Sequence, residues 1–190
     1  MSKCSALAFL TLMCLLLPAC HTSGSVHEPP SRSAGSWREV LQQRAAKFGH
    51  RNIIAIVDSA YPSQCKPGIE MIATGASQME VVDAVLREIG SQKHIRPQIM
   101  TDRELSAVTE ADAPGISAYR TALAERLKDL PTTSLPHEQI IATLDESAQT
   151  FDVLLLKTDM AMPYTSVFIR LECGYWNDAA EQRLRSVLKQ

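Results

Sequence analysis

This chain has few aromatic residues, and its positive and negative charges nearly balance. Of its 190 residues, 5% are aromatic, and the formal net charge is −2. A nucleic-acid binder needs a basic surface, and a single-strand binder also needs aromatic side chains on which bases stack. The composition therefore argues against nucleic acid as a partner. With 45% hydrophobic residues, a chain of this length is expected to form one globular domain.

The hydrophobic run near the N-terminus is too short to cross a membrane. Residues 5–17 follow Lys3 and carry no charge, whereas a bilayer core needs roughly 20 helical residues. A short apolar run behind a positive residue is typical of a signal peptide. We therefore assign residues 1–20 to a lipoprotein-type signal peptide and exclude them from the fold.

Residues 17–20, LPAC, resemble a bacterial lipobox, in which the cysteine becomes the lipidated first residue after cleavage. The expected lipidation site is Cys20. Because Pro18 is unusual in such a motif, cleavage by an ordinary signal peptidase stays open, as does an uncleaved N-terminal anchor. Each alternative places the domain outside the cytoplasm. The expected location is extracytoplasmic, lipid-anchored to a bacterial membrane on its periplasmic face.

Cysteines are few once the signal peptide is removed. The chain has 5, of which Cys4 and Cys14 leave with the signal peptide and Cys20 carries lipid. Cys65 and Cys173 remain. A disulfide between them is permitted in an oxidising compartment, and two free thiols are the alternative. The sequence contains no Cys–His spacing typical of zinc sites, so no metal is expected.

The mature chain divides into a tether and one α/β domain. Residues 21–36 are rich in Ser, Gly and Pro and lack hydrophobic periodicity, which indicates a flexible tether. Over residues 37–190, apolar runs alternate with helical patterns, which predicts a single domain with a sheet covered by helices. The expected strands are 52–57, 98–100, 152–157 and 165–171, and the expected helices are 37–48, 79–89, 116–128, 136–148 and from 177 onwards.

Helix boundaries are marked by side chains in two places. Ser36 with Glu39, and Ser77 with Glu80, form the capping-box pattern that begins a helix. Gly49 follows the first helix. We predict that it adopts the left-handed conformation that ends many helices.

Three short motifs occur in order between residues 37 and 171. The first is Gly49-His50, one strand, and the turn Asp58-Ser59-Ala60-Tyr61-Pro62; the second is His137-Glu138-Gln139 at a helix start; the third is the loop Pro163-Tyr164-Thr165-Ser166. In this order they resemble the D-ribose pyranase / L-fucose mutarotase family of sugar-ring isomerases. The resemblance implies a ring-forming α/β fold with sites between subunits.

The resemblance also implies an isomerase that interconverts anomers, or pyranose and furanose forms, of a monosaccharide through the open-chain sugar. One group removes the proton of the anomeric hydroxyl while another protonates the ring oxygen, so acid–base groups suffice and no cofactor is needed. His50 is the implied catalytic proton donor, since imidazole titrates near ~6.5. The implied substrate-binding residues are Asp58, His137, Tyr164, Thr165 and Ser166. Taken singly, each also has an ordinary role at a strand end, helix start or loop.

His50 and Asp58 lie on either side of one expected strand. An extended strand rises ~3.3 Å per residue, which puts the two residues about 20 Å apart, further than a monosaccharide spans. Either the ends of the strand curl towards each other or a neighbouring subunit supplies one residue. The second alternative fits the family and makes a homo-oligomer the expected partner.

Two departures from the family pattern bear on activity. Where the family has Tyr-x-Asn, this chain has Ser166 in the third position, a hydroxyl in place of an amide. The stretch from His137 to Tyr164 is also longer than in the ribose branch. Three readings therefore stay open: a mutarotase or pyranase, a non-catalytic monosaccharide-binding lipoprotein on the same scaffold, and a structural protein. An open pocket containing His50, Asp58, His137 and Tyr164 favours the first two, and a pocket filled by the protein's own side chains favours the third.

Overall fold

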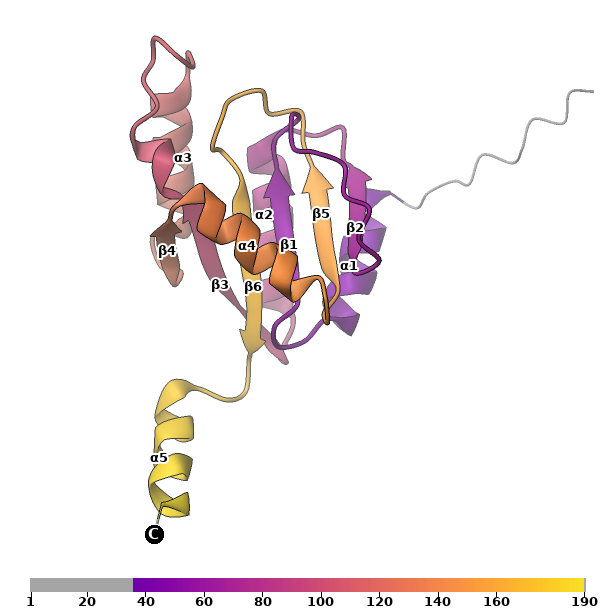
Figure 1. Ribbon diagram of the computed structural model, residues 1–190, viewed down its shortest axis with the longest axis vertical. Coiled ribbons are helices and arrows are strands. Elements are labelled where there is room, and N and C mark those ends of the chain that lie inside the picture. The colour runs from indigo at the N-terminus through magenta and orange to yellow at the C-terminus, as the bar shows by residue number, and fades with distance from the viewer. Residues whose placement is uncertain (1–35, 190) are drawn as a thin grey trace, which may run out of the picture. The chain divides into compact units, whose positions relative to one another are not determined.

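The structure is a computed structural model that describes residues 36–189 (Figure 1). The predicted signal peptide, the lipidation site Cys20 and the tether up to residue 35 lie outside the described residues. The elements in chain order are α1 (Trp37–Lys47), β1 (Ile53–Val57), β2 (Ile69–Ala73), α2 (Gln78–Ser91), β3 (Ile95–Asp102), the 3-10 turn η1 (Arg103–Ser106), α3 (Ile116–Leu127), β4 (Thr132–Leu135), α4 (His137–Ser147), β5 (Val153–Lys157), β6 (Val167–Cys173) and α5 (Asp178–Leu188).

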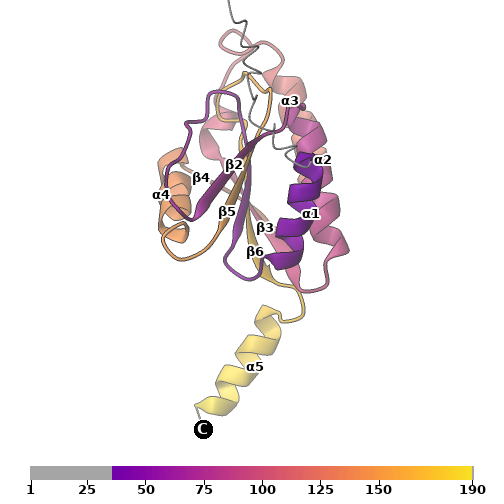
Figure 2. The same ribbon diagram turned by 90° about the vertical axis from the view of Figure 1, so that its right-hand side faces the viewer.

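Within residues 36–189, six strands form one mixed sheet in the order β2-β5-β1-β6-β3-β4. Strands β1 and β2 both run parallel to β5, and β3 runs parallel to β4. Strand β6 is antiparallel to its neighbours β1 and β3. Helices α1, α2 and α3 cover one face of the sheet, and α4 covers the other (Figure 2). The predicted α/β domain with a helix-covered sheet is therefore confirmed.

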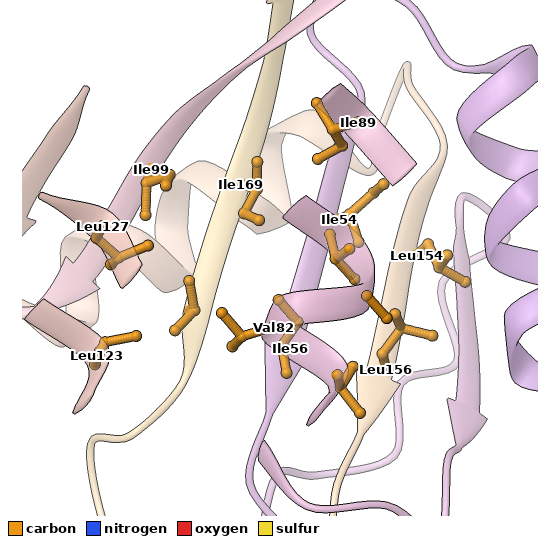
Figure 3. Packing of buried hydrophobic residues seen from close by; sticks show 14 of the residues in the cluster. Ile54, Ile56, Val82, Ile89, Ile99, Leu123, Leu127, Leu154, Leu156 and Ile169 are labelled. Carbon is orange, nitrogen blue, oxygen red and sulfur yellow. The ribbon is translucent and has the colours of Figure 1, made fainter. Parts of the chain in front are cut away.

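The central strands are buried on both faces. Every residue of β1 is fully buried, because successive side chains of a strand point to opposite faces and helices cover both. Ile54 and Ile56 of β1, with Leu154 and Leu156 of β5, belong to the core beneath α2 and α3 (Figure 3). Ile53 and the other odd-numbered residues of β1 pack on the α4 side. This double burial explains the continuous apolar runs that predict these strands.

Strands β2 and β4 are not predicted from the sequence, and both lie at edges of the sheet. The side chains of β4 are exposed apart from Leu135, which is half-buried. A strand paired on one side only tolerates polar residues such as Thr132 and Ser134, so the apolar signal of a strand is lost there. Strand β3, which has two neighbours, is longer than its predicted core of 98–100.

One predicted cap is confirmed and two details differ. The Ser77 hydroxyl accepts a hydrogen bond from the backbone N–H of Glu80. Ser36 begins α1 without a side-chain cap bond. The predicted left-handed conformation of Gly49 is wrong: the chain turns instead two residues later, at Arg51, where φ is 79°.

Cys65 and Cys173 do not form a disulfide. Both thiols are free, the first exposed and the second half-buried in β6. Of the two alternatives that the sequence leaves open, the structure has the free thiols.

Helix α5 has no buried residue. Tyr175 and Trp176, just before it, and Leu184, Val187 and Leu188 on it are exposed large hydrophobic residues. Across residues 36–189, no helix combines the length and apolar character that crossing a membrane requires.

Candidate functional site

A cavity of about 360 Å³ opens beyond the end of β1, beside the start of α4 and the loop that precedes β6. Three of the residues predicted to bind sugar, Asp58, His137 and Tyr164, lie in its wall. The full lining consists of Asp58, Ala60, Tyr61, Pro62, Gln64, His137, Glu138, Ile141, Pro163 and Tyr164. The cavity is open, and its size suits a small ligand. It is not filled by the protein's own side chains, and of the four residues expected together in an open pocket it holds three, without His50.

Asp58 follows directly after β1, and its carboxylate is held by two hydrogen bonds. Oδ1 accepts from the backbone N–H of Ala60 at 2.9 Å, and Oδ2 accepts from the hydroxyl of Ser166 at 3.2 Å. A carboxylate has about four acceptor positions. The two bonds therefore orient Asp58 and leave acceptor positions for hydroxyl groups of a ligand.

Tyr164 has an unusual backbone conformation for a bulky residue. Its φ is 58°, in the left-handed region, which is costly for side chains with a large Cβ substituent. Its ring meets the ring of His137 edge-on, with centroids 5.6 Å apart and an interplanar angle of 79°. Strained residues of this kind cluster at ligand sites, where surrounding structure holds them in place.

Thr165 and Ser166, both predicted to bind sugar, lie behind the cavity wall. The two residues are buried and are not among the lining residues. The Thr165 hydroxyl donates to the carbonyl of Met162 at 2.8 Å. Ser166 acts on the cavity only through Asp58, and Thr165 contributes through its backbone.

The backbone carbonyl of Thr165 is fixed by two buried donors that sequence reasoning missed. Gln78 Nε2 donates to it at 2.8 Å, and the hydroxyl of Tyr119 donates to it at 2.5 Å. Burial raises the pKa of Tyr119, which keeps the hydroxyl protonated as a donor. The apolar pattern of α2 and α3 gives no sign of this role, because a buried glutamine or tyrosine is also an ordinary core residue.

His137 begins α4 and is held by two carboxylates. Its Nδ1 lies 3.0 Å from Oδ1 of Asp102, and its backbone N–H donates to both oxygens of Glu104 at 3.1 Å. Burial raises the pKa of Asp102, whereas hydrogen bonds from its own backbone N–H and that of His137 lower the pKa of Glu104. Sequence reasoning missed Asp102. The available signal is its place at a strand end, which it shares with Asp58.

His50 lies away from the cavity, at the opposite end of the sheet. Its Nδ1 is 3.0 Å from Oε2 of Glu172, and the other oxygen of that carboxylate, Oε1, is 3.3 Å from Nε of Arg170. The ring is about half exposed (47%). Along β6, Glu172 is six residues from Ser166, so His50 and Asp58 are separated by about 20 Å. Within one chain the ends of the strand do not curl together.

The part of the chain from 36 to 189 has no cluster of three or more His, Cys, Asp or Glu side chains arranged to hold a metal ion. The predicted residues Asp58, His137 and Tyr164 bring a carboxylate, an imidazole and a phenol to the cavity. Together they can accept hydrogen bonds from hydroxyl groups and exchange a proton.

Comparison with known proteins gives a likeness in fold. No protein-family model matches this sequence, and no curated protein matches it. Among solved structures, Bacillus subtilis RbsD, complexed with D-ribose, gives a TM-score of 0.52 at 14% identity, covering 70% of this chain and 91% of that chain. The fucose mutarotase of Streptococcus pneumoniae, complexed with L-fucose, gives 0.47 at 20% identity, covering 70% and 91%. FucU from Bifidobacterium longum gives 0.48 at 12% identity, covering 70% and 94%.

The likeness to RbsD confirms, at the level of the fold, the resemblance that the three motifs predict. The domain has an α/β fold similar to that of RbsD. At 14% identity the likeness concerns the fold.

Proposed function

We propose that the domain binds a monosaccharide in the cavity beside Asp58, His137 and Tyr164 and catalyses exchange between its ring forms. The observation that carries the proposal is that residues far apart in the sequence, all singled out by their motifs, come together in one open cavity. An oriented carboxylate and an aromatic ring beside an imidazole form a surface suited to a polyhydroxylated ring. The RbsD fold, solved there with D-ribose bound, supports the same ligand class.

The reaction needs two proton-transfer groups and no cofactor. A base takes the proton of the anomeric hydroxyl, the bond from the anomeric carbon to the ring oxygen breaks, and an acid protonates that oxygen. Ring closure on the other face, or by another hydroxyl, reverses the roles. Positioned acid–base groups typically accelerate such a step ~10²–10⁴-fold.

We propose further that the acid, His50, comes from a neighbouring subunit. In its own chain His50 lies too far from the cavity to reach the same sugar, yet it is half exposed and already paired with a carboxylate. Assembly of several copies brings that end of one sheet to the cavity of the next. The protein is then active only as an oligomer.

The place of action is proposed from the N-terminal sequence. The charge-free run at 5–17 and the LPAC motif support export and lipidation at Cys20, on the periplasmic face of a bacterial membrane. Metabolic labelling with a fatty-acid analogue, with Cys20→Ala as the control, tests this. Label retained by the Cys20→Ala variant contradicts lipidation at that residue.

A second function, monosaccharide binding without turnover, has one observation in its favour. The Ser166 hydroxyl donates to Asp58 and does not reach the cavity. The cavity therefore lacks a polar side chain from the third position of the motif, where the family has asparagine. Saturation-transfer NMR of the mature protein with D-ribose, L-fucose or galactose separates the two functions. Exchange faster than in buffer, and lost in His50→Ala, supports catalysis; line broadening with exchange at the buffer rate supports binding alone.

A further inference from the structure

We infer that Asp102 is a positioning residue that fixes the tautomer of His137, so that His137 presents an unprotonated Nε2 to the cavity as the base of the reaction. This inference rests on the proposed function for the identity of the reaction, but the geometry of the pair stands independently of it. Asp102 lies outside the three sequence motifs. It reaches the site only through the ring of His137.

The sheet itself sets the distance between the two residues. Asp102 is the last residue of β3, where the register pairs it with Leu135, the last residue of β4. One proline separates Leu135 from His137, the first residue of α4. The side chain of His137 is therefore tied to the end of β3 by regular strand pairing and does not depend on a long loop.

The ring and the backbone of His137 are held by different carboxylates. The carboxylate of Glu104 accepts a hydrogen bond from the backbone N–H of His137 at the start of α4. This bond satisfies one of the donors that a helix leaves free at its N-terminus. Oδ1 of Asp102 lies 3.0 Å from Nδ1 of the ring, within hydrogen-bond distance. Since the helix end already has its own carboxylate, Asp102 is not needed to cap it.

Burial of Asp102 points to a role for its charge. The side chain is 1% exposed, and Oδ2 has no hydrogen-bond partner among the residues the structure describes. Burying a carboxylate with an unpartnered oxygen opposes folding. Its bond to the His137 ring is the contact that offsets this cost, and an ionised carboxylate is an acceptor only. Burial raises the pKa of Asp102, whereas the hydrogen bond from His137 lowers it; with Asp102 in its ionised form, the proton in the contact belongs to Nδ1.

A neutral imidazole that carries its proton on Nδ1 has a lone pair on Nε2. The ring of His137 is one-third exposed (33%) and lines the cavity with Asp58. Tyr164 contacts it edge-on and restrains its rotation. Since Nδ1 faces the buried Asp102, Nε2 lies at the other edge of the ring, the edge available to a ligand.

In the reaction, Nε2 takes the proton of the anomeric hydroxyl while the ring C–O bond breaks. The electron pair of the broken C–O bond goes to the ring oxygen, and that oxygen takes the proton of the partner subunit's His50. The two imidazoles exchange roles on closure, so no proton is gained or lost. The negative charge of Asp102 stabilises the imidazolium that forms on His137.

The test is ¹⁵N NMR of the His137 ring in the full protein, compared with Asp102→Asn. In the unmodified protein we expect a protonated Nδ1 and an unprotonated Nε2 in the neutral ring. In Asp102→Asn we expect the proton to redistribute towards Nε2. The matched control is Asp83→Asn, which removes a carboxylate that pairs with Arg126 between α2 and α3 and is expected to leave both nitrogens unchanged.

Several outcomes overturn the inference. A proton on Nε2 in the unmodified protein does so directly, and that measurement needs no variant to fold. An unchanged ring in folded Asp102→Asn does so as well. If the protein proves to exchange sugar ring forms, Asp102→Asn is expected to slow the exchange about tenfold or more, part of the ~10²–10⁴-fold that acid–base catalysis supplies. A protein that shows the expected tautomer without turnover keeps the positioning role of Asp102 and contradicts the proposed catalysis, including the role of His137 as its base.

Discussion

The hydroxyl of Ser166 donates a hydrogen bond to Oδ2 of Asp58 at 3.2 Å, between the end of β1 and the start of β6. The two strands are antiparallel neighbours in the sheet. The contact therefore joins two of the three sequence motifs at the edge of the cavity. Its consequence is that Ser166 orients the carboxylate and does not itself touch the ligand.

Ser166→Ala tests this contact. Because a buried hydrogen bond contributes about 0.5–1.5 kcal/mol, we expect a loss of about 1 kcal/mol in the free energy of unfolding, and several-fold weaker sugar binding as Asp58 loses its orientation. Urea unfolding and NMR titration with D-ribose measure the two effects. Ser186→Ala, which removes a hydroxyl bonded within α5, is the control. Unchanged binding in Ser166→Ala contradicts the role given to the contact.

Gln78→Leu tests the buried support of the loop before β6. Gln78 donates to the carbonyls of Ile56 and Thr165 and accepts from Thr158. The variant removes these three buried hydrogen bonds, although the Thr165 carbonyl keeps its bond from Tyr119 and the Thr158 hydroxyl keeps its bond to Val57. At about 0.5–1.5 kcal/mol for each bond, we expect a destabilisation of about 2–4 kcal/mol in urea unfolding.

Tyr119→Phe is the matched, milder variant, because the Thr165 carbonyl keeps its bond from Gln78. We expect a loss of about 1 kcal/mol. Equal stability losses in the two variants would show that Gln78 does not hold the loop in the way described.

Glu110 makes the stability of the protein depend on pH. Backbone hydrogen bonds from Gly115 and Ser117, at the start of α3, lower its pKa from 4.5 to about 2. The carboxylate therefore stabilises the folded state above pH 4.5, and this contribution disappears as the pH falls from 4.5 towards 2.

Urea unfolding of the unmodified protein and Glu110→Gln at about pH 6, 4 and 3 measures the effect. We expect the unmodified protein to be more stable at the highest pH and the gap to narrow at each lower pH. A gap that stays constant across the series contradicts the assigned pKa shift.

The sequence predicts the strands whose side chains are buried on both faces of the sheet, and it does not predict the strands whose side chains are only partly buried. Strands β1, β5 and β6 are predicted because helices on both faces demand apolar residues throughout. Strands β2 and β4 are missed because an edge strand carries no such demand. Gly49 is predicted to be left-handed by analogy with common helix ends, but the turn is made at Arg51, whose side chain gives no hint of it.

The candidate site is predictable where a motif marks it. Asp58, His137 and Tyr164 are named by the motifs and do line one cavity. Thr165 is named by the same motif, yet its side chain donates to the carbonyl of Met162 and is not part of the cavity lining. Asp102 is missed because strand pairing alone brings it to His137, and pairing between a predicted strand and an unpredicted one cannot be foreseen.

In the proposed oligomer the site is shared: one subunit supplies the cavity and the next supplies His50. Complementation between two inactive variants tests this arrangement. His50→Ala and Asp58→Asn are each expected to abolish accelerated sugar exchange. After the two variants are unfolded together in equal amounts and reassembled, about a quarter of the sites in a random homo-oligomer combine an intact His50 with an intact Asp58.

We expect the mixed oligomer to regain about a quarter of the unmodified exchange rate, measured by saturation-transfer NMR, because about a quarter of its sites are intact. Each variant reassembled alone is expected to stay at the rate in buffer. A mixed oligomer that remains inactive, while the unmodified protein recovers full activity from the same treatment, contradicts a site built from two subunits.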